Sequence, residues 1–194
     1  DLYAETGTAL AHCPPTNSIL GNCAYVPYML QAGVKVGLGT DCPTHNLWNV
    51  MLSVSQQHAI MPREMRGMAP WTPFELATVG SAKALRLEDK IGTLEPGKRA
   101  DIVTIDLSRN TGLYPLNVGT LLTFMAFNGP GTQVSDAMVD GEFLRRDGEF
   151  TIFDEEAIIA KANEWCDKFT VDYMTAKAAG DPMFNRVHEE YTRI

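Results

Sequence analysis

Residues 34–46 read VKVGLGTDCPTHN, and this stretch decides how the rest of the chain is interpreted. Its first residues alternate between apolar and other side chains, and this period of two predicts a short strand with at least one buried face. Gly39 and Thr40 follow the strand, so Asp41 stands where the strand gives way to a loop. Its position makes Asp41 the first candidate for a functional residue.

Helical patterns flank this strand on both sides. Residues 24–32 form one, ended by Gly33, and residues 47–61 form the other. The order helix, strand, loop, helix is typical of an α/β sheet or barrel, in which catalytic groups lie on loops at the carboxyl ends of strands. We therefore expect Asp41 to be catalytic, although a turn or a helix cap is the structural alternative for a single aspartate.

Three further motifs accompany Asp41. The chain contains HCPPTN at 12–17, AGVKVGLGTD at 32–41 and IGTLEPGKRADIV at 91–103. In this order and at this spacing they resemble the C-terminal part of amidohydrolase-superfamily enzymes. The most similar group contains guanine deaminase, the methylthioadenosine/adenosylhomocysteine deaminases and the triazine hydrolases. The resemblance covers most of the chain and does not identify the substrate.

The resemblance implies an α/β fold class, namely the C-terminal portion of a (β/α)8 barrel with its last two β/α units. Residues 8–11 would be the seventh barrel strand and residues 34–39 the eighth. We expect three parts: a partial TIM barrel at 1–90, part of a flanking small β-sandwich with a connecting segment at 91–150, and an amphipathic helix with a tail at 151–194. A complete barrel takes ~250 residues, so we expect the other strands upstream and do not regard residue 1 as a natural domain boundary.

Local patterns predict several elements within these parts. Pro14 and Pro15 argue against a helix in the HCPPTN loop. A helix with a Thr72 cap and a Glu75 capping box is expected from residue 72 to about residue 87, and its small residues suggest close approach to neighbouring backbone. The remaining predictions are a loop at 62–71, a strand at 100–105, helical structure at 121–127 and a hairpin at 133–146. A long helix at 154–177 should be capped by Asp154 and bury a stripe of Ile158, Ala162, Trp165 and Phe169.

The resemblance also implies a reaction. Enzymes of this group use zinc (Zn²⁺) or iron (Fe²⁺) to activate water, which attacks an amidine-like carbon of a purine, pyrimidine or triazine ring. Ammonia, an amine or chloride then leaves. The aspartate of the eighth strand is both a metal ligand and a proton acceptor, and these roles map onto Asp41. A small heterocyclic substrate is therefore the expected partner.

Other polar residues are candidates for the substrate pocket. His12 is expected either to line the pocket or to be held by loop backbone, and Asn17 to hold its loop by bonding backbone groups. His45 follows Asp41 closely enough to share its pocket or to face solvent. Cys42, adjacent to Asp41, is expected to be buried and inert.

The remaining metal ligands of the family have no counterpart in this sequence. The only histidines are His12, His45, His58 and His188, and no His-x-His pair occurs. We therefore expect this chain to be inactive alone, and to associate with a missing N-terminal barrel half or with copies of itself, because two barrel strands leave an open edge. The alternative is a non-catalytic oligomerisation or interaction domain that has lost its metal site. A nucleotide-binding domain is disfavoured because no G-x-G-x-x-G or Walker loop is present.

Composition limits the other functional classes. The net charge is −8, which argues against nucleic acid and anionic membranes as partners. The sequence has no run of apolar residues long enough to span a bilayer. The four cysteines form no CxxC pair, so free thiols and a cytoplasmic location are expected.

Overall fold

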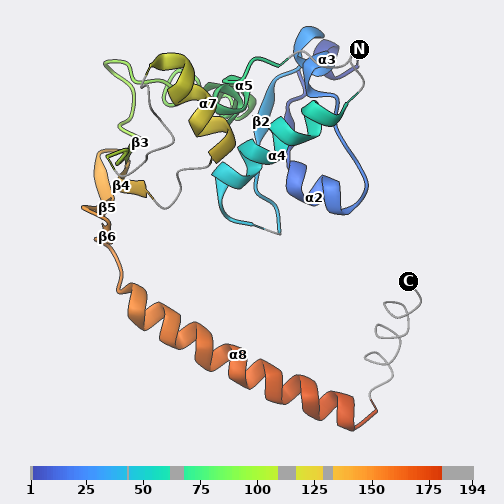
Figure 1. The fold of residues 1–194 in the computed structure, drawn as a ribbon, viewed down its shortest axis with the longest axis vertical. Coiled ribbons are helices and arrows are strands. Elements are labelled where there is room, and N and C mark those ends of the chain that lie inside the picture. Colours follow the sequence, from blue (N-terminus) through green and yellow to red (C-terminus); the bar gives the residue numbers. More distant parts are fainter. Residues whose placement is uncertain (1, 43, 62–67, 109–116, 129–132, 181–194) are drawn as a thin grey trace. The chain divides into compact units, whose positions relative to one another are not determined.

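The computed structural model describes every residue except 1, 43, 62–67, 109–116, 129–132 and 181–194. The chain divides into two compact units, Asp1–Thr151 and Ile152–Ile194 (Figure 1). The predicted division of the first unit near residue 90 stays a prediction. The first unit opens with the short helix α1 (Leu2–Thr6), which ends at Gly7 in a left-handed conformation.

A parallel pair of strands forms the centre of the first unit. Strand β1 (Leu10–His12) pairs with β2 (Val36–Leu38), with Leu10 opposite Val36 and His12 opposite Leu38. β2 lies within the strand predicted at 34–39 and is shorter, whereas β1 begins two residues later and ends one residue later than the strand predicted at 8–11. Between them run α2 (Pro14–Ile19) and α3 (Val26–Gln31), the kind of crossover that parallel strands require. Gly33 follows α3 at a φ of +84°, as its predicted role of ending the helix requires.

The prolines of the HCPPTN stretch begin α2, so the prediction that they exclude a helix is wrong. Pro14 and Pro15 occupy the first helical positions, where a backbone N–H has no partner within the helix. Cys13 precedes the helix, and Asn17 lies within it. The loop expected after β1 is therefore a helical turn stacked directly on the strand end.

The hydrophobic core lies between β2 and three helical segments. Helix α4 (Leu47–Ile60) agrees closely with its prediction and buries Val50, Met51 and Val54. The central cluster joins side chains from α3, β2, α4 and the helix that follows them; its members are Val26, Val34, Val36, Val54 and Leu76. The beginning of the motif at 34–46 is thus anchored by packing, and α4, which follows its end, packs into the same core.

The helix predicted from residue 72 consists of three consecutive pieces. These are α5 (Thr72–Glu75), a π-helical turn η2 (Leu76–Gly80) and α6 (Ser81–Ala84). The predicted Thr72 cap and capping box are wrong, because the N-cap is Trp71 and no side chain caps the helix. The helix begins one residue earlier than the capping pattern indicates, and this places Thr72 inside its first turn.

The same helix approaches β2 closely, which confirms the expectation from its small residues. A Cβ added to Gly80 would lie 2.7 Å from the carbonyl oxygen of Val36, and one added to Gly37 would lie 2.8 Å from Ser81 Cα. Glycine at both positions therefore lets the two backbones touch.

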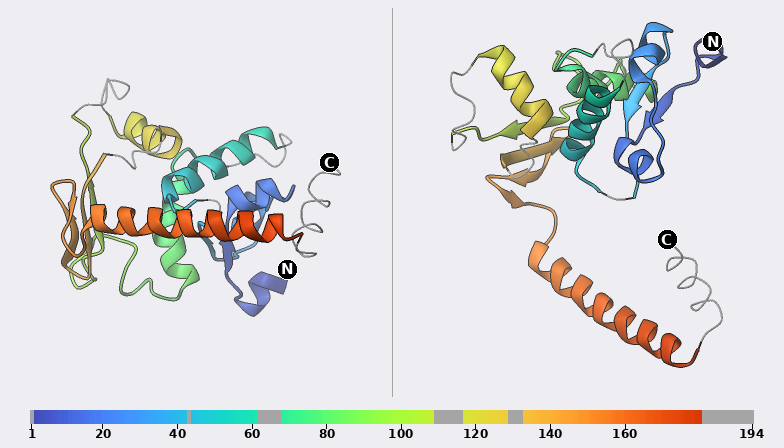
Figure 2. Two further views of the ribbon diagram at one scale, coloured as in Figure 1. Left: turned by 90° about the horizontal axis from the view of Figure 1, so that it is seen from below. Right: turned by 45° about the vertical axis from the view of Figure 1, so that its right-hand side comes forward.

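A four-stranded antiparallel sheet occupies the region where the resemblance predicts part of a β-sandwich. Its order is β3 (Ile102–Ile105), β4 (Val134–Val139), β5 (Glu142–Arg146) and β6 (Glu149–Phe150). Both hairpin turns are Asp-Gly pairs with positive φ at each residue, which matches the right-handed twist of the strands they join. Helix α7 (Val118–Asn128) packs against α4, as Figures 1 and 2 show.

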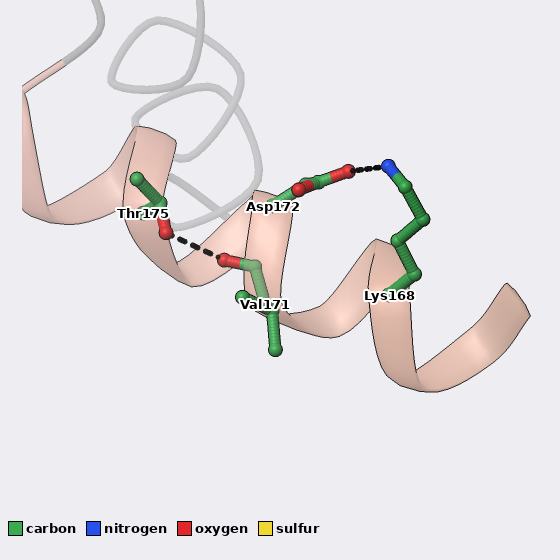
Figure 3. A network of polar contacts seen from close by, with 4 residues as sticks. All are labelled: Lys168, Val171, Asp172 and Thr175. Carbon is green, nitrogen blue, oxygen red and sulfur yellow. Dashed lines mark hydrogen bonds and ion pairs between the residues drawn. The ribbon is translucent and has the colours of Figure 1, made fainter. Parts of the chain in front are cut away.

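The second unit is dominated by α8 (Glu155–Ala178), which confirms the predicted long helix. The Asp154 carboxylate caps it by accepting the Ala157 N–H at 3.0 Å. Near its C-terminal end, Lys168 Nζ lies 2.7 Å from Asp172 Oδ2 and Thr175 Oγ1 donates to the Val171 carbonyl (Figure 3).

The apolar stripe of α8 was predicted to be buried, and this prediction is wrong. Trp165 is 61% exposed and Phe169 is 71% exposed, and Ile158 and Ala162 are exposed as well. The spacing of apolar residues predicts which face of a helix is hydrophobic, but it does not supply the surface that covers this face. Within the described ranges, no helix is both long and apolar enough to cross a membrane.

Candidate functional site

The carboxyl ends of β1 and β2 bring two of the predicted site residues to one edge. The strands are parallel, and the Gly39 N–H donates to the His12 carbonyl at 2.9 Å immediately after the paired residues. Asp41 follows two residues later. The strand-end position expected for His12 and Asp41 is therefore present.

Asp41 occupies an exposed turn in which its backbone has a φ of +52°. Such left-handed conformations cost energy for a residue with a side chain and occur frequently at functional sites. Helix capping does not explain this aspartate. The cap of α4 is Asn46, whose side-chain oxygen accepts the Trp48 N–H at 2.9 Å.

Cys13 links Asp41 to the beginning of α2. Burial raises the pKa of the Cys13 thiol, and the negative charge of Asp41 raises it further. Gly39 makes this arrangement feasible, because a Cβ there would lie only 2.9 Å from Cys13 Sγ. The Asp41 carboxylate is thus close enough to the HCPPTN segment for its charge to act on the Cys13 thiol.

His12 is buried, with 1% of its surface exposed, and neither ring nitrogen has a hydrogen-bond partner in the described part of the chain. Its pKa is lowered to about 4, first by burial and then by the charge of His58. His58, from the C-terminal half of α4, is also buried with both ring nitrogens unpaired, and burial lowers its pKa too. Both imidazoles are neutral at pH 7, and both retain a donor and an acceptor for a ligand or a neighbouring chain.

The other two residues predicted to line the pocket are Asn17 and His45, and neither belongs to the buried pair of His12 and His58. Asn17 is half-buried in α2, where its backbone N–H donates to Cys13 and its carbonyl accepts the Asn22 N–H. The loop-holding role expected of its side chain therefore falls to its backbone. His45 is exposed in the bend before α4. Cys42 is exposed, so the prediction that it is buried is wrong, because the left-handed turn at Asp41 carries the chain outward.

Gln57 is a structural residue of the site that the sequence interpretation missed. Its side-chain amide donates to the Pro14 carbonyl at 2.9 Å and to Ser18 Oγ at 2.5 Å, which ties α4 to the start of α2. A signal for it exists, since Val50, Val54 and Gln57 follow one another at spacings of four and three residues on the buried face.

A cavity of about 230 Å³ lies beside His58. Its walls are His58 and Ser55 of α4, Pro73 of α5, Phe127 of α7 and Met68. It is mostly apolar, with the unpaired imidazole of His58 as a polar group. A mostly apolar lining with few polar groups is common in pockets for small molecules, but this cavity is smaller than most of them.

The donor set for a metal ion is incomplete in the described residues. No group of three histidine, cysteine, aspartate or glutamate side chains that could hold a metal occurs among them. A catalytic zinc needs about three protein ligands, whereas the strand end supplies the carboxylate of Asp41. The residues present therefore do not fit a complete metal site and could contribute only one ligand to a larger one.

Comparison with known proteins gives a consistent result. The model of the family described as "Amidohydrolase family" matches residues 2–144. A 5-methylthioadenosine/S-adenosylhomocysteine deaminase of Teredinibacter turnerae is 33% identical over 86% of this chain and 38% of its own length. An S-triazine hydrolase of Gordonia rubripertincta is 32% identical over 84% of this chain and 35% of its own length.

A solved structure agrees with the sequence matches. A zinc-bound adenosine deaminase of Xanthomonas campestris superimposes with a TM-score of 0.79 at 27% identity. The match covers 88% of this chain and 39% of that protein. The chain thus spans well under half the length of the relatives it matches.

Proposed function

Because the chain belongs to the amidohydrolase family, we propose that it forms the C-terminal part of a metal-dependent hydrolase acting on a purine, pyrimidine or triazine-like ring. In this proposal β1 and β2 are the last two strands of a (β/α)8 barrel, and other polypeptide supplies the preceding strands. The reaction is hydrolytic removal of ammonia, an amine or chloride from the ring. Relatives described as deaminases and as a triazine hydrolase support this class of substrate.

The observation that carries the proposal is the placement of Asp41. It follows a buried parallel strand, does not cap the next helix, and acts electrostatically on the segment after the neighbouring strand. Carboxyl ends of parallel barrel strands are where such folds hold their catalytic groups. An aspartate with a purely structural turn role would not need this neighbourhood.

The chain's own residues then have distinct tasks. The Asp41 carboxylate accepts a proton from the attacking water, which a general base of this kind can do when its oxygen lies within hydrogen-bond reach. Asp41 would be the one ligand that this chain contributes to a zinc or iron ion, which would supply activation of the water near neutral pH. Neutral His58 lines the cavity and can donate and accept one hydrogen bond, so it suits ring nitrogens and exocyclic groups of a heterocycle. His12 is buried and is not among the residues that line this cavity, so its contact with a substrate stays a prediction.

The decisive experiment removes only the carboxylate charge. Asp41→Asn in the complete hydrolase, with the preceding barrel strands present, should lower kcat at least about a hundredfold, the lower end of what general acid–base groups contribute. Release of ammonia or chloride from adenosine-type nucleosides, guanine and a chlorotriazine provides the assay.

Asp147→Asn is the matched control. Asp147 is also an exposed aspartate with a φ of +52°, but it lies in the turn between β5 and β6. This variant should keep kcat within about twofold of the parent, as most surface substitutions do. Equal activity of the two variants would contradict the proposed role of Asp41. A complete protein that turns over no such substrate would favour the non-catalytic interaction domain.

A further inference from the structure

We propose that Ser81 is a positioning residue that holds the carboxyl end of β2 and thereby fixes the turn containing Asp41. The catalytic meaning of this inference rests on the proposed function, since it concerns the strand that presents Asp41. The holding itself is a property of the chain and can be measured without any activity.

The hydroxyl of Ser81 makes two hydrogen bonds that join the helix to the strand. Ser81 Oγ donates to the Leu76 carbonyl at 2.8 Å and accepts the Leu38 N–H at 3.1 Å. The donated bond commits the only hydroxyl proton, so a lone pair is left to face Leu38. Leu38 is the last residue of β2 and lies three positions before Asp41.

β1 cannot supply this bond. The Gly39 N–H already bonds the His12 carbonyl of β1. Successive residues of a strand alternate in direction, so the Leu38 N–H points to the opposite side of β2. Ser81 therefore satisfies a backbone donor at the strand end that the described partner strand does not reach.

The π-helical turn brings Ser81 to this position. The Leu76 carbonyl accepts both the backbone N–H and the hydroxyl of Ser81, five residues ahead, which is the spacing of a π turn. An ordinary α-helical turn would rotate the residues that follow away from their present orientation. Single π turns inside α-helices are frequent at functional sites.

Two glycines allow the hydroxyl to come close enough. Ser81 Oγ lies 3.0 Å from where a Gly37 Cβ would stand, and the Val36 carbonyl lies 2.7 Å from the corresponding position of Gly80. Any larger residue at either position would move the helix away from the strand. The hydroxyl contact and the close packing are thus parts of one arrangement.

The Ser81 hydrogen bond can affect Asp41 because the short segment between them along β2 is held at two points. Ser81 holds Leu38 on one side, while the His12 carbonyl holds Gly39 on the other. Asp41 follows in a left-handed turn that is unfavourable for a residue with a side chain and needs fixed flanks to persist. Loss of the Ser81 bond should therefore loosen the turn.

The test is amide hydrogen exchange and ¹⁵N relaxation by NMR on this chain carrying Ser81→Ala. We expect the amide hydrogen of Leu38 to exchange about tenfold faster, because the variant loses one hydrogen bond of typical net strength. The Asp41 amide should lose order in the same variant. Amides of β3 and β4 should keep their rates, which a general loss of stability would not allow.

Two further variants make the result specific. Thr78→Val removes another hydroxyl of the same helix, one that bonds only carbonyls of its own helix (Phe74 and Glu75), and it should leave Leu38 and Asp41 unchanged. Ser81→Thr keeps the hydroxyl and should preserve the exchange rate of the Leu38 amide within about threefold. This variant also serves as the test if Ser81→Ala does not fold. A folded Ser81→Thr chain in which the Leu38 amide is unprotected would contradict the proposal.

Unchanged exchange at Leu38 in Ser81→Ala, or uniform acceleration of all amides, would overturn the positioning role. Neither readout depends on catalysis, so failure of the proposed hydrolase activity would remain a separate result.

Discussion

His12 and His58 illustrate how tertiary packing changes the chemistry of single residues. Each side chain is buried without a hydrogen-bond partner in the described ranges, and the charge of each ring would disfavour that of the other. Burial of an imidazole favours its neutral form, so the pKa falls in the folded state. These two residues should therefore make the stability of the fold depend on pH.

We expect the free energy of unfolding to decrease as the pH falls from 6.5 to about 4. The folded-state pKa of His12 is about 4, whereas the unfolded chain takes up the proton near pH 6.5. Stability is thus fully present above pH 6.5 and is lost below it, with His12 accounting for roughly 3 kcal/mol at pH 4. Urea unfolding at several pH values measures this change.

The control for this prediction is an exposed histidine. His45→Gln should leave the pH dependence intact, whereas His12→Leu should flatten it, because it removes the titrating group while keeping an apolar side chain of similar size. If the free energy of unfolding changes equally with pH in His12→Leu and in the parent, His12 is not the source of the pH dependence.

Among the secondary-structure elements, the contact between η2 and β2 determines where the candidate site lies. The helix touches the strand backbone through Gly37 and Gly80, and Ser81 adds the hydrogen bond to Leu38. Glycine normally weakens a helix, by about 1 kcal/mol relative to alanine. Here the close approach is the reason that glycine is needed.

Gly80→Ala should destabilise the chain by about 1–3 kcal/mol, in spite of the better helix propensity of alanine, because the added methyl meets a backbone carbonyl that cannot move freely. The matched control is Gly119→Ala in α7, where the nearest atom is the end of the Asn117 side chain at 3.3 Å. This second change should be neutral or stabilising. Free energies of unfolding in urea compare the two, and equal effects would contradict the crowding argument.

For the molecule as a whole, two features are incomplete within the described residues. The parallel sheet contains two strands, although parallel sheets are normally larger and covered on both faces. The apolar face of α8, with Trp165 and Phe169, is exposed. Open strand edges and exposed aromatic side chains both favour association with other polypeptide.

We therefore predict that the isolated chain associates with copies of itself or with the remaining barrel strands, and that it hydrolyses no heterocycle on its own. Size-exclusion chromatography with light scattering measures the first property, and ammonia release measures the second. A clean monomer would contradict the first part, and turnover by the purified chain alone would contradict the second.

Local patterns were sufficient for much of this structure. Alternation placed β2, helical periodicity placed α3 and α4, Asp-Gly pairs placed the hairpin turns, and Asp154 marked the start of α8. These features depend on neighbouring residues, whose spacing the sequence shows directly. The motifs also located Asp41 at a strand end, which the fold confirms.

Contacts between distant segments could be decided only by the tertiary structure. The sequence does not show that His58 approaches His12, that Cys13 lies beside Asp41, or that a π turn delivers Ser81 to Leu38. It also marked the apolar face of α8 without showing whether that face is covered. The physical reason is that periodicity fixes the direction of a side chain relative to its own element, whereas burial, pKa and partners depend on which other elements pack against it.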